Sequence, residues 1–274
     1  SVAGKMNPDD SRSQLIFKFL DCVNHVKPLG FVCENVKALA ISKRWENVRS
    51  ALFDEVMQDY TSTIILLNSM EYGVPQARER MFFIGIRKDI FSGDADELHF
   101  KLQKNLTQYR KLPISIGRLI QKFGKAGSEV NPITCTAKIM YAKNPVLRRS
   151  PYAGMLFNGA GRPLSVDKYS STLPASMGGN KTPIVDEDEI FNGKTSFVEK
   201  YHERLRKGGK PREGQAPSRL RRLTLTECKA IQTFPENFQF VGGKSSIYRQ
   251  IGNAVPCELA FAVAGAYLKT LNNS

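Results

Sequence analysis

Residues 72–87, YGVPQARERMFFIGIR, join a turn to a strand, and the rest of the chain is interpreted outward from them. Residues 72–75 predict the turn, because glycine accepts unusual backbone angles and proline fixes its own. Residues 80–87 predict a buried strand, because an apolar, aromatic-rich run is closed by a charge at each end. Gln76, Arg78 and Arg80 therefore lie where a turn enters the core.

The two arginines of this stretch share one side of an extended chain, because alternate side chains of a strand point the same way. One interpretation is an ordinary charged turn before a core strand. The other is a pair of guanidinium groups held at a strand edge, which suits a phosphate or the edge of a base. Residues 72–87 alone leave both interpretations open.

The charge of the whole chain favours a polyanionic partner. Its 274 residues include 40 Lys+Arg against 26 Asp+Glu, a formal net charge of +14. Such an excess most often indicates nucleic acid. The alternative is a soluble basic protein without such a partner.

The cysteines indicate reduced thiols in an intracellular, cytoplasmic protein, since an odd number without CxxC spacing predicts neither disulfides nor a zinc site. They are Cys22, Cys33, Cys135, Cys228 and Cys257. No apolar run approaches the length of a membrane span and no signal peptide is visible, so no membrane partner is expected. The chain begins SVAGK without an initiator Met, which indicates that it was cut from something longer.

The first ninety residues alternate between helical and strand patterns. Helices are predicted at about 12–25 and 44–58, and strands at 29–33 (ending in Glu34-Asn35-Val36), 61–67 and 81–86. This order predicts the second half of a doubly wound α/β sheet, closed by an antiparallel hairpin. The apolar strand and Gly-rich turn that open a Rossmann-like domain are not present before Ser1.

Three domains follow from changes in composition: a partial α/β domain at 1–89, a loop-rich domain at 90–217, and a segment at 218–274 that returns to the first. In the second, helical periodicity fades, while Gly, Pro, Ser, Asn and basic residues become frequent. Its basic run at 200–222 suits a phosphate backbone, or else a solvated face. In the third, a helix capped by Thr224 or Thr226 precedes a loop at 248–256 and a buried apolar helix at 257–271.

Four short blocks occur in one order: Glu-Asn-Val at 34–36, Gln-x-Arg-x-Arg at 76–80, Arg-Leu-Thr-x-x-Glu at 222–227 closing in Phe-Pro at 234–235, and Gln-x-Gly-Asn-Ala-Val-Pro at 250–256. Each block is weak alone. Together, with a variable basic region between the second and third, they are specific. From residue 1 to about 271 the chain resembles the DNA cytosine-5 methyltransferases.

The resemblance implies the C-terminal half of a Rossmann-like, S-adenosylmethionine-dependent methyltransferase sheet domain, plus a smaller target-recognition domain at about 90–217. In the family a Pro-Cys-Gln loop carries the nucleophile just before a segment that resembles SVAGK. By that layout the nucleophile and the main cofactor motif are not in this chain. Cys257 is interpreted as structural and Cys33 as a packing residue. A missing N-terminal half, or a complementary subunit carrying the cysteine, is the implied partner.

The resemblance also implies roles in a reaction that adds a thiolate to carbon 6 of cytosine and methylates carbon 5. Glu34 would accept from the exocyclic amine and share a proton with N3, if burial raises its pKa. Arg80 would donate to O2 of the base. Arg78 would support Glu34 and the catalytic loop. Asn253, with Gly252, would contact S-adenosylmethionine.

Double-stranded DNA is the implied substrate, and the target base must leave the duplex to reach such a site. The contacts with DNA are assigned to Arg12, Arg148, Arg149 and Lys181, the last in the loop at 172–181. The leading interpretation is a fragment or subunit of a bacterial or phage restriction-modification methyltransferase that is inactive alone. The alternative is a DNA-binding module without chemistry. An unrelated Rossmann-like nucleotide enzyme is disfavoured, because no phosphate-binding Gly loop is present.

Overall fold

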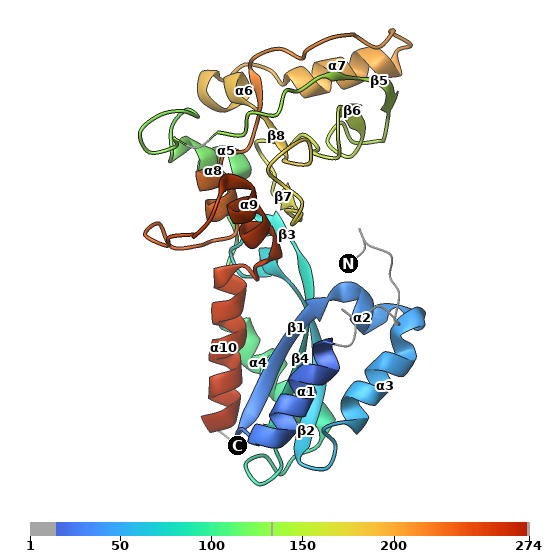
Figure 1. Ribbon diagram of the computed structural model, residues 1–274, viewed down its shortest axis with the longest axis vertical. Coiled ribbons are helices and arrows are strands. Elements are labelled where there is room, and N and C mark those ends of the chain that lie inside the picture. Colours follow the sequence, from blue (N-terminus) through green and yellow to red (C-terminus); the bar gives the residue numbers. More distant parts are fainter. Residues whose placement is uncertain (1–14, 133, 273–274) are drawn as a thin grey trace. The chain divides into compact units, whose positions relative to one another are not determined.

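The computed structural model describes residues 15–132 and 134–272 (Figure 1). The chain forms two compact units, here called the sheet unit (1–72, 78–111 and 260–274) and the loop-rich unit (73–77 and 112–259). Their boundaries differ from the three predicted domains. Residues 90–111 group with the sheet, while 218–259 group with the loop-rich unit. The predicted division into three domains stays a prediction.

The sheet unit is built on three strands in the order β1-β4-β2, with β4 antiparallel to both neighbours. Its elements are α1 (Leu15–Val26), β1 (Gly30–Val36), α2 (Lys37–Ile41), α3 (Glu46–Asp54), β2 (Tyr60–Asn68), β4 (Glu79–Arg87) and α4 (Ala95–Thr107), with short 3-10 helices at Lys43–Trp45 and Ser69–Glu71. The predicted β2–β4 hairpin is confirmed. The strand predicted to end at Cys33 continues through Val36, because Val36 still pairs with Arg80 of β4.

Each face of this sheet is covered by its own helices. Phe31, Met81 and Phe83 project from one face into a core made with α1, α2 and α3. On the opposite face Thr63 meets His99 of α4, with 3.1 Å between the hydroxyl oxygen and ring Nδ1. Aromatic rings dominate the first core: Phe31 packs against Phe83 at a centroid distance of 5.2 Å. Burial of such rings is a main stabilising contribution.

Helix α4 corrects the expectation that helical periodicity fades after residue 89. Asp94 caps it by accepting a hydrogen bond from the Glu97 amide at 2.8 Å. Leu98, Leu102 and Leu106 form one buried stripe at four-residue spacing. The stripe was present in the sequence, but lysines and polar residues between its members obscured it.

The loop-rich unit contains short elements connected by long irregular segments. They are β3 (Gln76–Ala77), α5 (Ile116–Gln121), β5 (Tyr141–Val146), β6 (Met155–Phe157), β7 (Ser170–Ser171), β8 (Ile184–Asp186), α6 (Glu187–Asn192), α7 (Phe197–Arg206), β9 (Leu220–Arg222), α8 (Leu225–Ile231) and α9 (Lys244–Asn253). One core lies among α5, α8 and α9, and a second among β5, β6 and α7. The predicted cap of α8 is confirmed as a reciprocal box between Thr224 and Glu227.

Three expectations for the C-terminal part of the chain were wrong. Residues 248–253, predicted as loop, belong to α9, which begins after Gly243 without a side-chain cap. The last helix, α10 (Cys257–Asn272), is buried on one side only, since Phe261 is 67% and Leu268 53% exposed. The span Lys244–Asn272 has the length and composition of a membrane-crossing helix, contrary to expectation. Ala254–Pro256 interrupt it, and residues of both helices pack in the protein core.

Candidate active site

Glu34 and Arg80 form a close ion pair on the sheet. Arg80 Nε lies 2.7 Å from Glu34 Oε1, and the side chains are 14% and 28% exposed. Strand register explains the meeting: Glu34 of β1 pairs with Phe82 of β4, so Arg80 is its diagonal neighbour on the same face. The sequence prediction placed both residues in one site, and the structure brings them together.

Arg78 is the third member of this charged group. Its side chain is 2% exposed, and burial lowers its pKa to about 10, with the positive charge of Arg80 adding to the effect and Glu34 opposing it. Burial also lowers the pKa of Arg80, against the attraction of Glu34. Two guanidinium groups and one carboxyl thus interact in a partly desolvated place, where charge interactions are strong.

Burial raises the pKa of Glu34, although the charges of Arg80 and Arg78 and a hydrogen bond from Arg80 pull it down. Desolvation therefore wins over two neighbouring cations. A carboxyl in this balance can hold a proton more readily than an exposed glutamate, which suits general acid–base chemistry. The side chain of adjacent Asn35 accepts a hydrogen bond from the Val36 amide at 2.8 Å, which fixes the end of β1.

The cysteines do not join this group. Cys33 pairs with Phe83, so it lies on the face opposite Glu34, and burial raises its pKa to about 11. Burial also raises the pKa of Cys228 and of Cys257. These environments disfavour the thiolate that a nucleophile requires. Cys22 is exposed on α1, whose core-facing residues are Ile16, Leu20 and Val23.

Gly252 and Asn253 belong to the last turn of α9, in the loop-rich unit. Asn253 is exposed, whereas Gly252 is buried. A Cβ on Gly252 would lie 2.6 Å from Pro174 O and 2.7 Å from Ala175 Cα. Close packing against the backbone at 174–175 therefore explains why a glycine stands at position 252. Its contact with a cofactor stays a prediction.

Gly252→Ala is expected to lower the stability of the loop-rich unit by about 1–3 kcal/mol, because a methyl group forced against backbone overpacks the core. Thermal unfolding of the chain measures the change. Gly179→Ala is the matched control, since a Cβ at Gly179 would meet nothing within 4 Å. Equal melting temperatures for the two variants would contradict the packing explanation.

The predicted DNA contacts lie in exposed parts of the loop-rich unit. Arg148 and Arg149 follow β5, and Lys181 lies between β7 and β8; all three are exposed. Arg148 is held through its main chain, whose carbonyl oxygen lies 2.9 Å from His202 Nε2. This contact uses the backbone of Arg148, and the residue is exposed. Arg12 lies outside the described residues.

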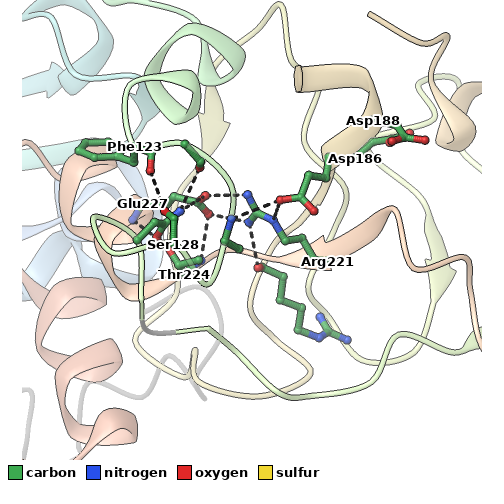
Figure 2. A network of polar contacts seen from close by, with 12 residues as sticks. Phe123, Ser128, Asp186, Asp188, Arg221, Thr224 and Glu227 are labelled. Atoms are coloured by element: carbon green, nitrogen blue, oxygen red, sulfur yellow. Dashed lines mark hydrogen bonds and ion pairs between the residues drawn. The ribbon is translucent and has the colours of Figure 1, made fainter. Parts of the chain in front are cut away.

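Part of the basic run at 200–222 forms internal ion pairs, a use that neither of the two interpretations of the sequence included. Arg219 lies 2.7 Å from Asp186, and Arg221 bonds Glu227 through two nitrogens at 2.9 and 2.8 Å (Figure 2). Glu227 is fully buried and also accepts from the Thr224 amide at 2.9 Å. These arginines stabilise the fold, while Lys200, Arg204 and Lys207 line the surface at α7.

Arg222 is a buried cation that binds main-chain oxygens. It is 2% exposed and donates to the carbonyl oxygens of Thr182 at 2.8 Å, Ala137 at 3.1 Å, Asn180 at 3.2 Å and Asn158 at 3.4 Å. Side-chain oxygens of Asn158 and Asn180 accept as well. One side chain thus ties together the segments around 137, 158 and 180–182.

Sequence reasoning missed the structural roles of Asn131 and Gln232. Asn131, 0% exposed, donates to Glu227 at 3.0 Å and accepts from the Thr224 hydroxyl at 2.5 Å. Gln232, also 0% exposed, bonds Gln76 at 3.0 Å. The signal available for Gln232 was its position directly after Ile231 at the C-terminal end of α8, where a buried polar side chain needs a partner.

The sheet and its helices define a methyltransferase fold. The structure matches the S. pombe Dnmt2 methyltransferase with a TM-score of 0.61 at 16% identity, covering 98% of this chain and 76% of that one. It matches Entamoeba histolytica methyltransferase EhMeth with a TM-score of 0.58 at 15% identity, covering 97% and 70%. At such identities the likeness concerns the fold alone.

Comparison with sequence relatives shows which methyltransferases this chain is similar to. The chain is 30% identical to the type II methyltransferase M.PspPI of Psychrobacter sp., covering 99% of this chain and 62% of the relative. It is 29% identical to M.NgoPII of Neisseria gonorrhoeae, covering 96% and 71%. Residues 1–269 match the profile of C-5 cytosine-specific DNA methylases, and the chain belongs to that family.

Proposed function

We propose that this chain supplies the Glu34–Arg80 half of an active site that methylates carbon 5 of cytosine in double-stranded DNA. The supporting observation is the partly buried ion pair itself: an acid whose pKa is raised lies 2.7 Å from a strand arginine. Neither group needs such surroundings for a purely structural role, because desolvating both charges is unfavourable.

In this reaction negative charge develops in the cytosine ring when a thiolate adds to carbon 6. Glu34 shares its proton with N3, while Arg80 donates a hydrogen bond to O2 of the base. The positive charge of Arg78 stabilises the carboxylate form of Glu34. Carbon 5, now enamine-like, takes the methyl group, loses its proton and the thiolate departs. S-adenosylmethionine supplies the electrophilic methyl group, and the exposed amide of Asn253 fits one polar contact with it.

The thiolate comes from a residue other than the five cysteines of this chain. Cys33, Cys228 and Cys257 have raised pKa values, and Cys33 is turned away from Glu34. The chain spans 62% of the length of M.PspPI. We place the nucleophile and the main cofactor contacts in a preceding N-terminal half, within the same polypeptide or in a complementary subunit.

The basic loop-rich unit is the proposed reader of the DNA sequence, through Arg148, Arg149 and Lys181, with the target base flipped out of the duplex. A bacterial or phage restriction-modification system, acting in the cytoplasm, accounts for the similarity to type II methyltransferases.

The isolated chain is expected to transfer no methyl group above buffer, and addition of the N-terminal half is expected to restore transfer. Labelled S-adenosylmethionine and double-stranded DNA measure incorporation, with a Cys→Ser N-terminal half as control. Incorporation by the isolated chain would overturn the placement of the nucleophile. DNA binding without incorporation in any combination would instead favour a binding module without chemistry.

A further inference from the structure

Gln76 and Gln232 form a buried amide pair in the loop-rich unit. Gln76 Nε2 donates to Gln232 Oε1 at 3.0 Å, and both residues are 0% exposed. Gln76 opens the Gln-x-Arg-x-Arg block that continues into Arg78 and Arg80. An amide pair buried this completely is stabilising only when all its polar atoms are satisfied, so the remaining partners decide its role.

On the Gln76 side the pair holds residues 170–173. Gln76 Oε1 accepts from the Leu173 amide at 2.7 Å. The Thr172 hydroxyl donates to Ala77 O at 2.8 Å, and the short strands β3 and β7 run parallel beside this contact. Residues 170–173 lead directly into the predicted recognition loop at 172–181.

On the Gln232 side the pair holds the turn that carries Asn253. Gln232 Nε2 donates to Ile251 O at 2.6 Å and to Ala254 O at 3.3 Å. Its main-chain oxygen accepts from the Cys257 amide at 3.1 Å. The two helices α9 and α10 therefore meet on one glutamine.

A third contact closes the arrangement. The backbone at Pro174–Ala175 packs on Gly252, where even a Cβ would lie 2.6 Å from Pro174 O. Three segments, at 76–77, 170–175 and 251–257, thus hold one another, with the amide pair between them.

The hydrogen bonds run in one direction, which fixes how both amides are oriented. The Leu173 amide can only donate and the Ile251 carbonyl can only accept. Gln76 must therefore present oxygen to residue 173 and nitrogen to Gln232, which passes the same order onward. If the side chain at position 76 has no donor, the hydrogen bond to Gln232 at the centre of this series is lost.

We propose that Gln76 and Gln232 are positioning residues for methyl transfer. They hold the recognition segment at 170–175, the Asn253 turn and residues 76–77 in one arrangement. This role rests on the proposed function, because it acts through residues assigned to DNA and cofactor. Neither glutamine contacts a reacting atom.

Gln76→Glu tests the role through its pH dependence. The ionised carboxylate keeps the acceptor for Leu173 but faces Gln232 Oε1 without a proton, whereas the neutral acid can donate again. Titratable groups on the neighbouring elements are engaged elsewhere: Glu227 with Arg221, Lys229 with Glu236 O, and the Tyr248 hydroxyl with Leu223 O. The positive charge of Arg78, two residues further along the chain, opposes protonation of the carboxylate.

In the complete enzyme, kcat of Gln76→Glu is expected to be about tenfold below wild type at pH 8, since a buried acceptor is left facing an anion. Towards pH 6 the ratio of variant to wild type should rise as the carboxyl gains its proton. Gln58→Glu, at an exposed position of the sheet unit, is the charge-matched control and should keep a constant ratio.

Unfolding of the isolated chain is measured across the same pH range. A lower melting temperature for Gln76→Glu at pH 8 that recovers towards pH 6 would show that the Gln76–Gln232 hydrogen bond stabilises the fold. This result needs no assay of methylation. A wild-type enzyme that does not methylate would contradict the proposed function, and this unfolding result would still decide whether the pair holds the fold. Unchanged kcat in Gln76→Glu, with or without lost stability, would overturn the positioning role.

Discussion

Glu34→Gln is expected to lower kcat for cytosine methylation by about 10²–10⁴-fold in the complete enzyme, the usual contribution of a positioned acid–base group. Glutamine keeps the size of the side chain but cannot give up a proton to N3. It also replaces the carboxylate that lies 2.7 Å from Arg80 Nε, so the guanidinium loses its countercharge. Single-turnover methyl transfer measures the chemical step, and DNA binding measured separately should change little.

Glu79→Gln is the matched control for this substitution. Glu79 lies next to Arg80 in the sequence, but its carboxylate is 44% exposed and pairs with Lys37 at 2.7 Å. Exposed pairs of this kind contribute about 0–1 kcal/mol, so kcat should stay within about threefold of wild type. A Glu34→Gln enzyme as active as Glu79→Gln would remove Glu34 from the chemistry.

Glu227→Ala is expected to destabilise the loop-rich unit by about 3–5 kcal/mol, because it leaves Arg221 and the polar groups around it without their buried carboxylate. Glu227 is 0% exposed and accepts from Arg221, the Thr224 amide and Asn131. It also closes the capping box that starts α8. Urea unfolding, followed by a probe in the loop-rich unit, measures the loss.

The comparison is Glu203→Ala, which removes a carboxylate from an ion pair of 2.7 Å whose side chains are 75% and 65% exposed. That change should cost less than about 1 kcal/mol. The two substitutions remove the same group from opposite surroundings. Similar losses from both would show that burial of the Arg221–Glu227 pair contributes little to stability.

The contact between Glu34 and Arg80 could be predicted from sequence because both residues lie on strands of strong β pattern. Once β1 and β4 are neighbours, period-two alternation puts Glu34 and Arg80 on one face. It was harder to predict which residues of the two strands lie beside each other, because that depends on the strand register. The same alternation explains why Cys33, one residue away, serves the opposite core.

The loop-rich unit was less predictable, since its contacts join residues far apart in sequence through main-chain oxygens. Arg221 and Arg222 could not be told from surface arginines by composition, although Arg222 is buried and Arg221 is partly buried. Helix α9 has no capping side chain that would mark its start in the sequence. In α4, polar and charged residues between the buried leucines weakened the helical pattern. In each case tertiary packing, and not local propensity, decided the structure.

The way Arg222 is held bears on how much sequence change the segments around it can tolerate. Its acceptors at Ala137, Thr182 and Asn180 are carbonyl groups that every amino acid possesses. Substitution of Ala137 or Thr182 keeps these acceptors, whereas substitution of Asn158 or Asn180 also removes a side-chain oxygen that accepts from Arg222. The segments around 137 and 182 can thus vary in side chain while Arg222 still ties them together, because the anchor there rests on the main chain.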